Sequence, residues 1–398
     1  MTYKDIITDA NNLYKAYLAT IDSSKWKEST QIFRMFFLRW IFKLQDELIN
    51  QTIKNRINSE FELRERGKIR PITSIPTDGR MIRHVLCDEI FLPIIKRKII
   101  YDNGASVKGR GITFQRKRFE IHLRRYIREN GLNGWIIFSD FRKFYDNIVH
   151  ELAINDLLKL VNYDPYIEWL LSVIFDGFRI DVSHLTDEEY NDIFFGIFDK
   201  LKYRESIRKV DQLSGVRYMP KSVNIGDQLS QVIGIYFPHD IDNYIKYVRQ
   251  QKYYGRYSDD WYIISRNKEE LLDIFQEVKT IADRKMIHIN EKKTCIIKID
   301  KTMTFLQIKY IITKEGKIIK RIKSKKVTDF RRKLRKLYKK LCNNAIPYSN
   351  IENMFKSWMG NFYKLITRKQ RKNLLELYEE LFNKNIEIKN KKMIITNR

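Results

Sequence analysis

The chain has 398 residues, 43% of them hydrophobic and 13% aromatic, which favours a folded protein with large cores and excludes a disordered one. Its formal net charge of +27 predicts a polyanionic partner, and nucleic acid is the expected one because its phosphate backbone supplies most of the affinity for basic proteins. Three cysteines without a CxxC pair predict buried, reduced thiols and no zinc site, and the lack of a leader or a long apolar run predicts a cytoplasmic protein that makes no membrane contact.

The first 60 residues are predicted to be helical. Apolar side chains recur there at four-residue spacing, as in Ile32, Phe36, Trp40 and Leu44. Such a stripe predicts a helix that packs on the rest of the protein, and a platform for RNA is the alternative.

A basic β-hairpin and a glycine-rich loop follow. Residues 61–76 alternate polar and apolar side chains on either side of Gly67, and residues 78–84 have the pattern of a helix start. Residues 103–111 contain glycines, which let a backbone approach a phosphate closely, together with basic side chains. The residue order of a nucleotide-binding P-loop is absent, and a basic amphipathic helix continues to Arg125.

Two acidic boxes give the strongest signal in the sequence. In the first, an apolar, strand-like run from Gly134 ends in Asp140. In the second, residues 253–265, Asp259 and Asp260 separate two runs of aromatic and β-branched residues, which predicts a hairpin with the acidic pair at its tip. Adjacent carboxylates at a tight turn repel each other unless a cation lies beside them, so the pair favours a divalent metal. A solvated Asp-Asp turn explains the hairpin alone, but it does not explain the first box.

Helical patterns occur between and after these boxes. Residues 151–220 have the pattern of a helix followed by an acidic, aromatic segment and a loop. Residues 222–231 contain Gly226 and Ser230 and open a helical run that is expected to reach Val248. Another amphipathic helix is predicted over residues 271–286.

The last quarter of the chain is basic and helical. Residues 301–398 hold 27 Lys and Arg against 7 Asp and Glu, more than a solubilising surface requires. An apolar stripe from Phe330 to Leu341 has basic side chains on the remaining helix face, and further helices are expected over residues 351–366 and 369–383. Helices that bury one face and expose lysines and arginines are typical of a surface that follows a nucleic-acid backbone.

The two acidic boxes resemble, in order, the two catalytic motifs of reverse transcriptases. Tyr257-Ser258-Asp259-Asp260 is similar to one motif, and Asp140 followed by Tyr145-Asp146 is similar to the other. The resemblance implies an α+β right-hand polymerase with fingers, an antiparallel-sheet palm and a helical thumb. It predicts four parts of the chain: an N-terminal helical extension (1–60), fingers (61–134), a palm with an insertion at about 151–220 (135–300), and a primer grip with a basic thumb (301–398).

The same resemblance implies a role for individual residues. Asp140, Asp259 and Asp260 are expected to be catalytic and, with the backbone carbonyl of Phe141, to hold two Mg²⁺ about 3.5–4 Å apart, with Mn²⁺ as the alternative ion. Tyr145 is expected to exclude a ribose 2′-hydroxyl. The other expected nucleotide-binding residues are Lys68, Arg70, Gly226 and Lys293. The expected nucleic-acid contacts are Lys108, Arg110, Arg331, Arg332 and Arg335.

Some positions depart from the family pattern. Asn224-Ile225 replaces the usual Pro-Gln before Gly226, and Gln307 replaces the glycine of the Phe-Leu-Gly primer grip. The Ser230-Gln231 pair resembles bacterial diversity-generating and phage-defence reverse transcriptases more than intron or retroviral ones.

The resemblance therefore implies a free-standing bacterial RNA-directed DNA polymerase that copies a dedicated noncoding RNA into cDNA from deoxynucleoside triphosphates in phage defence. A template-independent or protein-primed DNA polymerase of the abortive-infection type is one alternative. A non-catalytic RNA-binding protein on the same fold is another. A homo-oligomer or a partner protein also stays open.

Overall fold

The computed structural model describes residues 2–22, 24–54, 59–65, 68–178, 180–190, 218–219, 221–389 and 392–397. The chain divides into two compact units. The first unit comprises Met1–Phe119 and Ile136–Ile296, and the second comprises Glu120–Trp135 and Ile297–Arg398. One boundary falls inside helix α7 (Ile112–Asn130), at a place where the sequence pattern gives no sign of a division.

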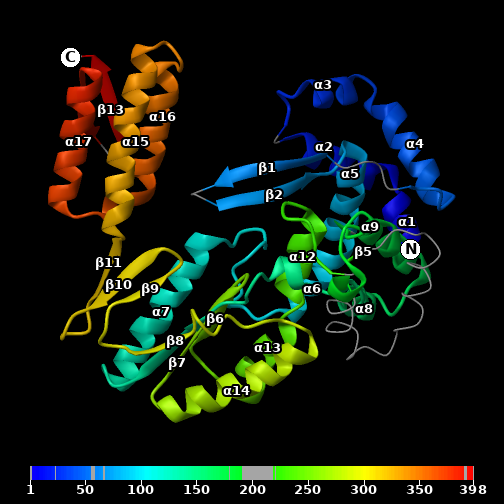
Figure 1. The fold of residues 1–398 in the computed structure, drawn as a ribbon, viewed down its shortest axis with the longest axis horizontal. Coiled ribbons are helices and arrows are strands. Elements are labelled where there is room, and N and C mark those ends of the chain that lie inside the picture. The colour runs from blue at the N-terminus through cyan, green and yellow to red at the C-terminus, as the bar shows by residue number, and fades with distance from the viewer. Residues whose placement is uncertain are drawn as a thin grey trace. The chain divides into compact units, whose positions relative to one another are not determined.

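Helices fill the N-terminal region, as predicted (Figure 1). They bury Leu13, Ile41 and Leu48, but Ile32 and Phe36 of the predicted packing stripe are exposed, so that part of the prediction is wrong. Helix α1 begins with a capping box in which Thr2 and Asp5 satisfy each other's backbone N–H groups. The helices are α1 (Tyr3–Thr8), α2 (Ala10–Asp22), α3 (Glu28–Met35) and α4 (Phe37–Ile49).

The predicted basic hairpin and the helix after it are confirmed. Strands β1 (Ser59–Glu65) and β2 (Lys68–Ser74) pair antiparallel, with Ser59 opposite Ser74, and the predicted turn residue Gly67 lies outside the described residues. Helix α5 (Thr77–Val85) follows Pro76 and continues through a π-helical turn, η1 (Leu86–Phe91), into α6 (Leu92–Lys98).

A four-stranded sheet forms the core of the first unit. Its strand order is β6 (Tyr254–Tyr257), β7 (Asp260–Ser265), β3 (Trp135–Ser139) and β8 (Cys295–Lys298), and β6 and β7 pair antiparallel. The expected combination of helices with antiparallel strands is thus confirmed.

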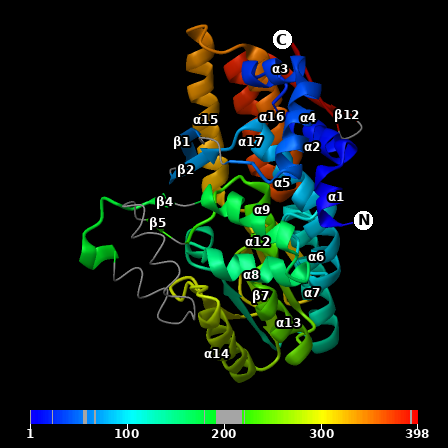
Figure 2. The same ribbon diagram turned by 90° about the vertical axis from the view of Figure 1, so that its right-hand side faces the viewer.

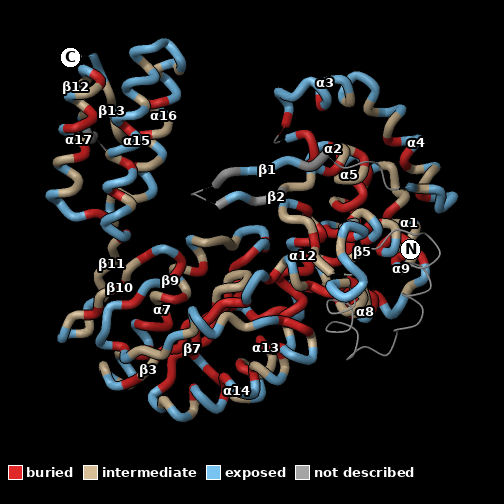
Figure 3. Tube along the Cα trace, in the orientation of Figure 1, coloured by how far each residue is buried: buried red, intermediate tan, exposed pale blue. Residues whose placement is uncertain are grey.

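Strand β7 is covered on both faces. Trp261, Tyr262, Ile263 and Ile264 are all buried although successive side chains of a strand point to opposite faces (Figure 3). The ring of Tyr262 lies 4.6 Å from that of Phe119 on α7, and the ring of Trp261 lies 6.4 Å from that of Phe275 on α14. Helix α14 (Lys268–Arg284) matches the helix predicted over residues 271–286.

The helices between the acidic boxes differ from expectation at one point. A single helical run to Val248 is wrong, because α12 ends at Tyr236 and Pro238, which has no N–H to donate, separates it from α13. Helices α8 and α9 pack against each other, and the segment 191–217 of the expected insertion lies outside the described residues (Figure 2). The elements are η2 (Tyr145–Asn147), α8 (His150–Leu160), α9 (Pro165–Asp176), β4 (Ile180–Asp181), β5 (Tyr218–Met219), α12 (Gln228–Tyr236), α13 (His239–Asn243) and η3 (Tyr244–Val248).

The second unit combines a three-stranded sheet with three long helices. Phe330 and Leu334 of the predicted stripe are buried together with Phe355, Leu374 and Tyr378, so the stripe is a core face. The C-terminal hairpin, β12 with β13, was not predicted. The elements are β9 (Met303–Phe305), β10 (Ile308–Ile312), β11 (Ile318–Ile322), α15 (Ser324–Cys342), α16 (Tyr348–Phe362), η4 (Tyr363–Leu365), α17 (Arg368–Phe382), β12 (Lys384–Lys389) and β13 (Lys392–Asn397).

The cysteines correct one expectation. Cys87 is buried, but Cys295 and Cys342 are exposed, so the prediction of buried thiols is wrong at two positions. Cys295 lies on β8, at the edge of its sheet, and Cys342 is the last residue of α15. Among the described residues, no helix has both the length and the apolar character that a membrane crossing requires.

Candidate active site

The fold brings the two acidic boxes together. Asp140 directly follows β3, Asp259 lies in the turn between β6 and β7, and Asp260 is the first residue of β7. Strands β3 and β7 are neighbours in the sheet. The backbone N–H of Phe141 donates to the carbonyl of Asp259 at 3.3 Å, which joins the end of one strand to the turn of the other. Residues about 120 positions apart in sequence therefore meet at one edge of the sheet.

The carboxylates carry more negative charge than their surroundings neutralise. Burial, followed by the charges of Asp259 and Asp140, raises the pKa of Asp260 to about 7. Burial and then the charge of Asp140 also raise the pKa of Asp259. Asp140 is 6% exposed, and its buried Oδ1 atom accepts no hydrogen bond from the described part of the chain. Such a group needs a cation or a donor, so the donor set fits a divalent metal ion.

The arrangement is not a closed metal cage. Within the described residues, no group of three or more His, Cys, Asp or Glu side chains is positioned to hold a metal ion as it stands. The ammonium of Lys293 instead lies 2.6 Å from Oδ2 of Asp140, and the amide of Asn290 lies 3.4 Å from the same oxygen. The expected three-aspartate metal cluster is thus not formed among the described residues, and the ammonium of Lys293 contacts one of the three carboxylates.

A buried ion pair positions the turn that carries Asp259. The guanidinium of Arg256 is fully buried and donates to the carbonyl of Ser258 at 2.9 Å. It also contacts Asp242 at 2.6 Å. Ser258 has φ = 56°, the left-handed conformation required by the tight turn that presents Asp259. Arg256 and Asp242 were not among the predicted site residues, although a charged residue between the aromatic residues of a buried strand is a usable signal.

Tyr145 lies beside this turn. Its backbone carbonyl accepts from Val223, and burial raises the pKa of its hydroxyl, which is hydrogen-bonded to Ser258. A Cβ atom on Gly234 would lie 2.6 Å from the Tyr145 hydroxyl oxygen, so the glycine makes room for the ring. Tyr145 thus borders the acidic cluster, as the resemblance implies.

Gly226 lines a cavity of about 230 Å³, together with residues of β2 and α5. Its φ of 102° requires glycine. Arg80 faces the same cavity, and its buried Nε atom has no hydrogen-bond partner among the described residues. Arg80 was not among the predicted nucleotide-binding residues. Lys68 and Arg70 are residues of β2, but their side chains lie outside the described residues.

The basic residues of the glycine-rich loop have different surroundings. Lys108 is exposed. Arg110 donates to the carbonyl of Asn103 at 3.0 Å, and its guanidinium carbon lies 5.1 Å from the centre of the Tyr101 ring, so this side chain holds the loop together. The loop joins β6 through the N–H of Gly104.

In the second unit, the basic face expected for the thumb lies on α15, and the segment expected to be a primer grip forms the turn between β9 and β10. Arg332 and Arg335 are exposed on α15, whereas Arg331 is partly buried. The turn between β9 and β10 has positive φ at Leu306 and Gln307 (45° and 69°), a conformation for which glycine is better suited.

Comparisons with known proteins found a matching family model and similar solved structures. A family model described as reverse transcriptase (RNA-dependent DNA polymerase) matches residues 54–310, which include both acidic boxes. Among similar solved structures is telomerase from Candida albicans in complex with a TWJ fragment of telomeric RNA, with a TM-score of 0.43 and 10% identity. That alignment covers 73% of this chain and 50% of the telomerase chain, so this chain spans about half of its length. No curated protein sequence matches the chain.

Proposed function

Because the chain belongs to the reverse transcriptase family, we propose that it synthesises DNA on an RNA template. The observation that carries the proposal is the meeting of Asp140 with the Asp259-Asp260 turn at the ends of two neighbouring strands. In this reaction the primer 3′-oxygen forms a bond to the α-phosphorus of a deoxynucleoside triphosphate. The bond from that phosphorus to the bridging oxygen breaks, and pyrophosphate leaves with the electron pair.

The residues of the site have different proposed roles, which follow from their positions and charges. Asp140, Asp259 and Asp260 would hold two Mg²⁺, which when bound lower the pKa of the primer hydroxyl and neutralise the phosphates. Lys293 neutralises Asp140 in the absence of metal, and from this place, 2.6 Å from Oδ2 of Asp140, its ammonium would be available to donate a proton to the leaving group. Arg256 fixes the turn through Ser258, and Tyr145 borders the place where a ribose would lie, which supports DNA as the product.

The proposal extends to the biological template. The Ser230-Gln231 pair supports a bacterial enzyme that copies a dedicated noncoding RNA in phage defence. Sequencing of the RNA and DNA that copurify with the full-length protein tests this part. A cDNA complementary to one abundant noncoding RNA is expected, whereas DNA that protease treatment releases as a tyrosine adduct would indicate a protein-primed enzyme.

Primer extension tests the activity itself. Wild-type protein should extend a DNA primer on an RNA template with Mg²⁺ and should stop when EDTA removes the metal. Asp259→Asn should lower the rate by at least about a hundredfold, because the contribution of a metal-bound carboxylate to charge neutralisation is lost. Asp273→Asn is the matched control, since Asp273 is exposed and forms a surface pair with Arg249. Equal rates for wild type and Asp259→Asn would refute the proposal.

A further inference from the structure

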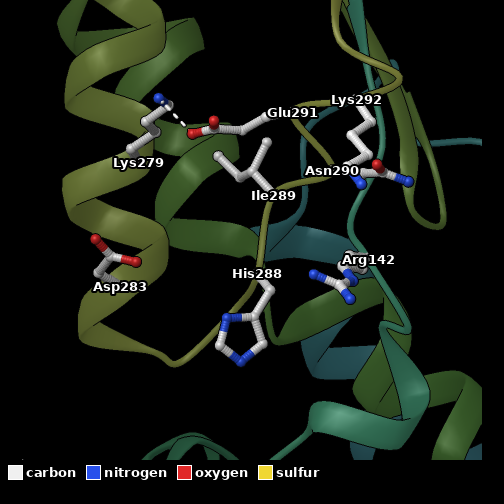
Figure 4. A pocket seen from close by; sticks show the side chains of 8 residues that line it. All are labelled: Arg142, Lys279, Asp283, His288, Ile289, Asn290, Glu291 and Lys292. Atoms are coloured by element: carbon white, nitrogen blue, oxygen red, sulfur yellow. Dashed lines mark ion pairs between the residues drawn. The ribbon is translucent and has the colours of Figure 1, made fainter.

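A second cavity adjoins the acidic cluster within the first unit. It has a volume of about 530 Å³ and is formed by Arg142, by residues 288–292 and by one side of α14 (Figure 4). In Figure 4, Arg142, Asn290 and Lys292 lie on one side of it, and Lys279, Glu291 and Asp283 lie on the other. None of the residues that line this cavity has a role in the proposed reaction described above.

Backbone pairing connects the cavity to the catalytic carboxylate. The N–H of Arg142 donates to the carbonyl of His288 at 2.7 Å, and the N–H of Asn290 donates to the carbonyl of Asp140 at 2.9 Å. Phe141 and Ile289 form an isolated antiparallel bridge, so Asp140 and Arg142 lie opposite Asn290 and His288, respectively. The Asn290 amide spans the two sites, since it lines the cavity and lies 3.4 Å from Oδ2 of Asp140.

The cavity has an excess of positive charge on the side nearest Asp140. Lys279 is neutralised by Glu291 at 2.6 Å. Arg142 and Lys292 are both exposed, and neither forms an ion pair with any side chain in the described part of the chain. Asp283 lies on the opposite wall, on α14, so an anion would be placed against Arg142 and Lys292 and away from that carboxylate.

We propose that this cavity binds the pyrophosphate released by nucleotide addition. The inference rests on the proposed function and adds an exit site for its product. A forked guanidinium and an ammonium match the oxygens of a compact polyanion, and charge-assisted hydrogen bonds of this kind are the strong ones. The cavity can enclose two phosphoryl groups with their water, whereas a nucleic-acid duplex is too large to enter it. Pyrophosphate that leaves the metal site reaches Arg142 without crossing the sheet.

Two measurements on the full-length chain test the inference. Calorimetry with inorganic pyrophosphate reports binding directly, and added pyrophosphate in primer extension reports product inhibition. Arg142→Gln and Lys292→Gln should each raise the dissociation constant and the inhibition constant about tenfold, since each removes one charge-assisted contact. Lys279→Gln is the matched control on the same cavity and should change either constant by less than about twofold, because Glu291 already neutralises this lysine.

The outcomes separate the exit site from the proposed function. If the wild type makes DNA but the Arg142→Gln/Lys292→Gln double variant binds pyrophosphate as tightly as wild type, the exit site is refuted and the polymerase remains. The same conclusion follows if these variants weaken only the affinity for primer–template. If the wild type makes no DNA but the variants lose pyrophosphate binding, the anion site stands and the polymerase proposal falls. Unfolding midpoints by circular dichroism, expected to match wild type, show that each variant is folded.

Discussion

Removal of the carboxylate that neutralises Arg256 should destabilise the first unit and displace the turn that carries Asp259. Arg256 is 0% exposed and Asp242 is 1% exposed, and the two side chains lie 2.6 Å apart. Asp242 also accepts a hydrogen bond from the Tyr254 hydroxyl. Asp242→Ala therefore leaves a buried guanidinium without its counter-ion, a change that costs about 3–5 kcal/mol of unfolding free energy. The guanidinium will move toward solvent and release Ser258, and a displacement of about 1 Å at a reacting group can lower the rate about a hundredfold.

Urea unfolding followed by circular dichroism measures the first effect, and single-nucleotide addition measures the second. Asp273→Ala is the control because it removes the same kind of partner from an arginine at the surface. Asp273 and Arg249 are 60% and 29% exposed, so their pair contributes about 0–1 kcal/mol. Hydrogen exchange of the β6 amides should accelerate in Asp242→Ala only. The reasoning is refuted if both variants shift the urea midpoint equally.

Three further predictions concern single positions. In the metal-free protein, the raised pKa of Asp260, about 7 against its usual 3.8, makes the free energy of unfolding fall as the pH rises from about 4 to about 7. Asp260→Asn should therefore unfold at a higher urea concentration than wild type at pH 8 and at a similar one at pH 4, and equal midpoints at pH 8 contradict this. Gly234→Ala should change the free energy of unfolding by less than about 1 kcal/mol. It should nevertheless displace Tyr145 and so reduce the discrimination between deoxy- and ribonucleotides in competition assays. Unchanged discrimination would show that the ring tolerates the methyl group. Gln307→Gly should raise the free energy of unfolding of the second unit by up to about 1 kcal/mol, because Gln307 has φ = 69°. The control Asn361→Gly, in α16, should lower this free energy. A lower unfolding midpoint for Gln307→Gly than for wild type would count against a strained turn.

Much of the local structure could be predicted from the sequence. The hairpin after residue 58, the acidic hairpin, the helix at 268–284 and the three C-terminal helices follow from short-range periodicity, which fixes which face of each element is apolar. The order of the two acidic boxes was sufficient to indicate the reverse transcriptase family, and the family match confirms that prediction. The roles of Asp140, Asp259 and Asp260 stay predictions, although the fold places these residues together.

Other features were decided only by tertiary structure. No local pattern shows that Lys293 contacts Asp140, because their contact depends on how the segment after α14 pairs with the end of β3. The cavity beside Arg142 arises from the same pairing. Exposure of Cys295 follows from the place of β8 at the edge of the sheet, which the residue's own neighbours in sequence do not specify.

The sequence by itself determined most of the helices and strands and the family, because periodicity and short motifs act over a few residues and can be recognised without knowledge of the fold. The tertiary structure decided which charges meet. Arg256 with Asp242, and Lys293 with Asp140, are paired by the order of strands in one sheet and by the helices that cover it. A buried charge is stable only beside its partner, so the identity of the partner depends on the assembled core and not on either segment alone.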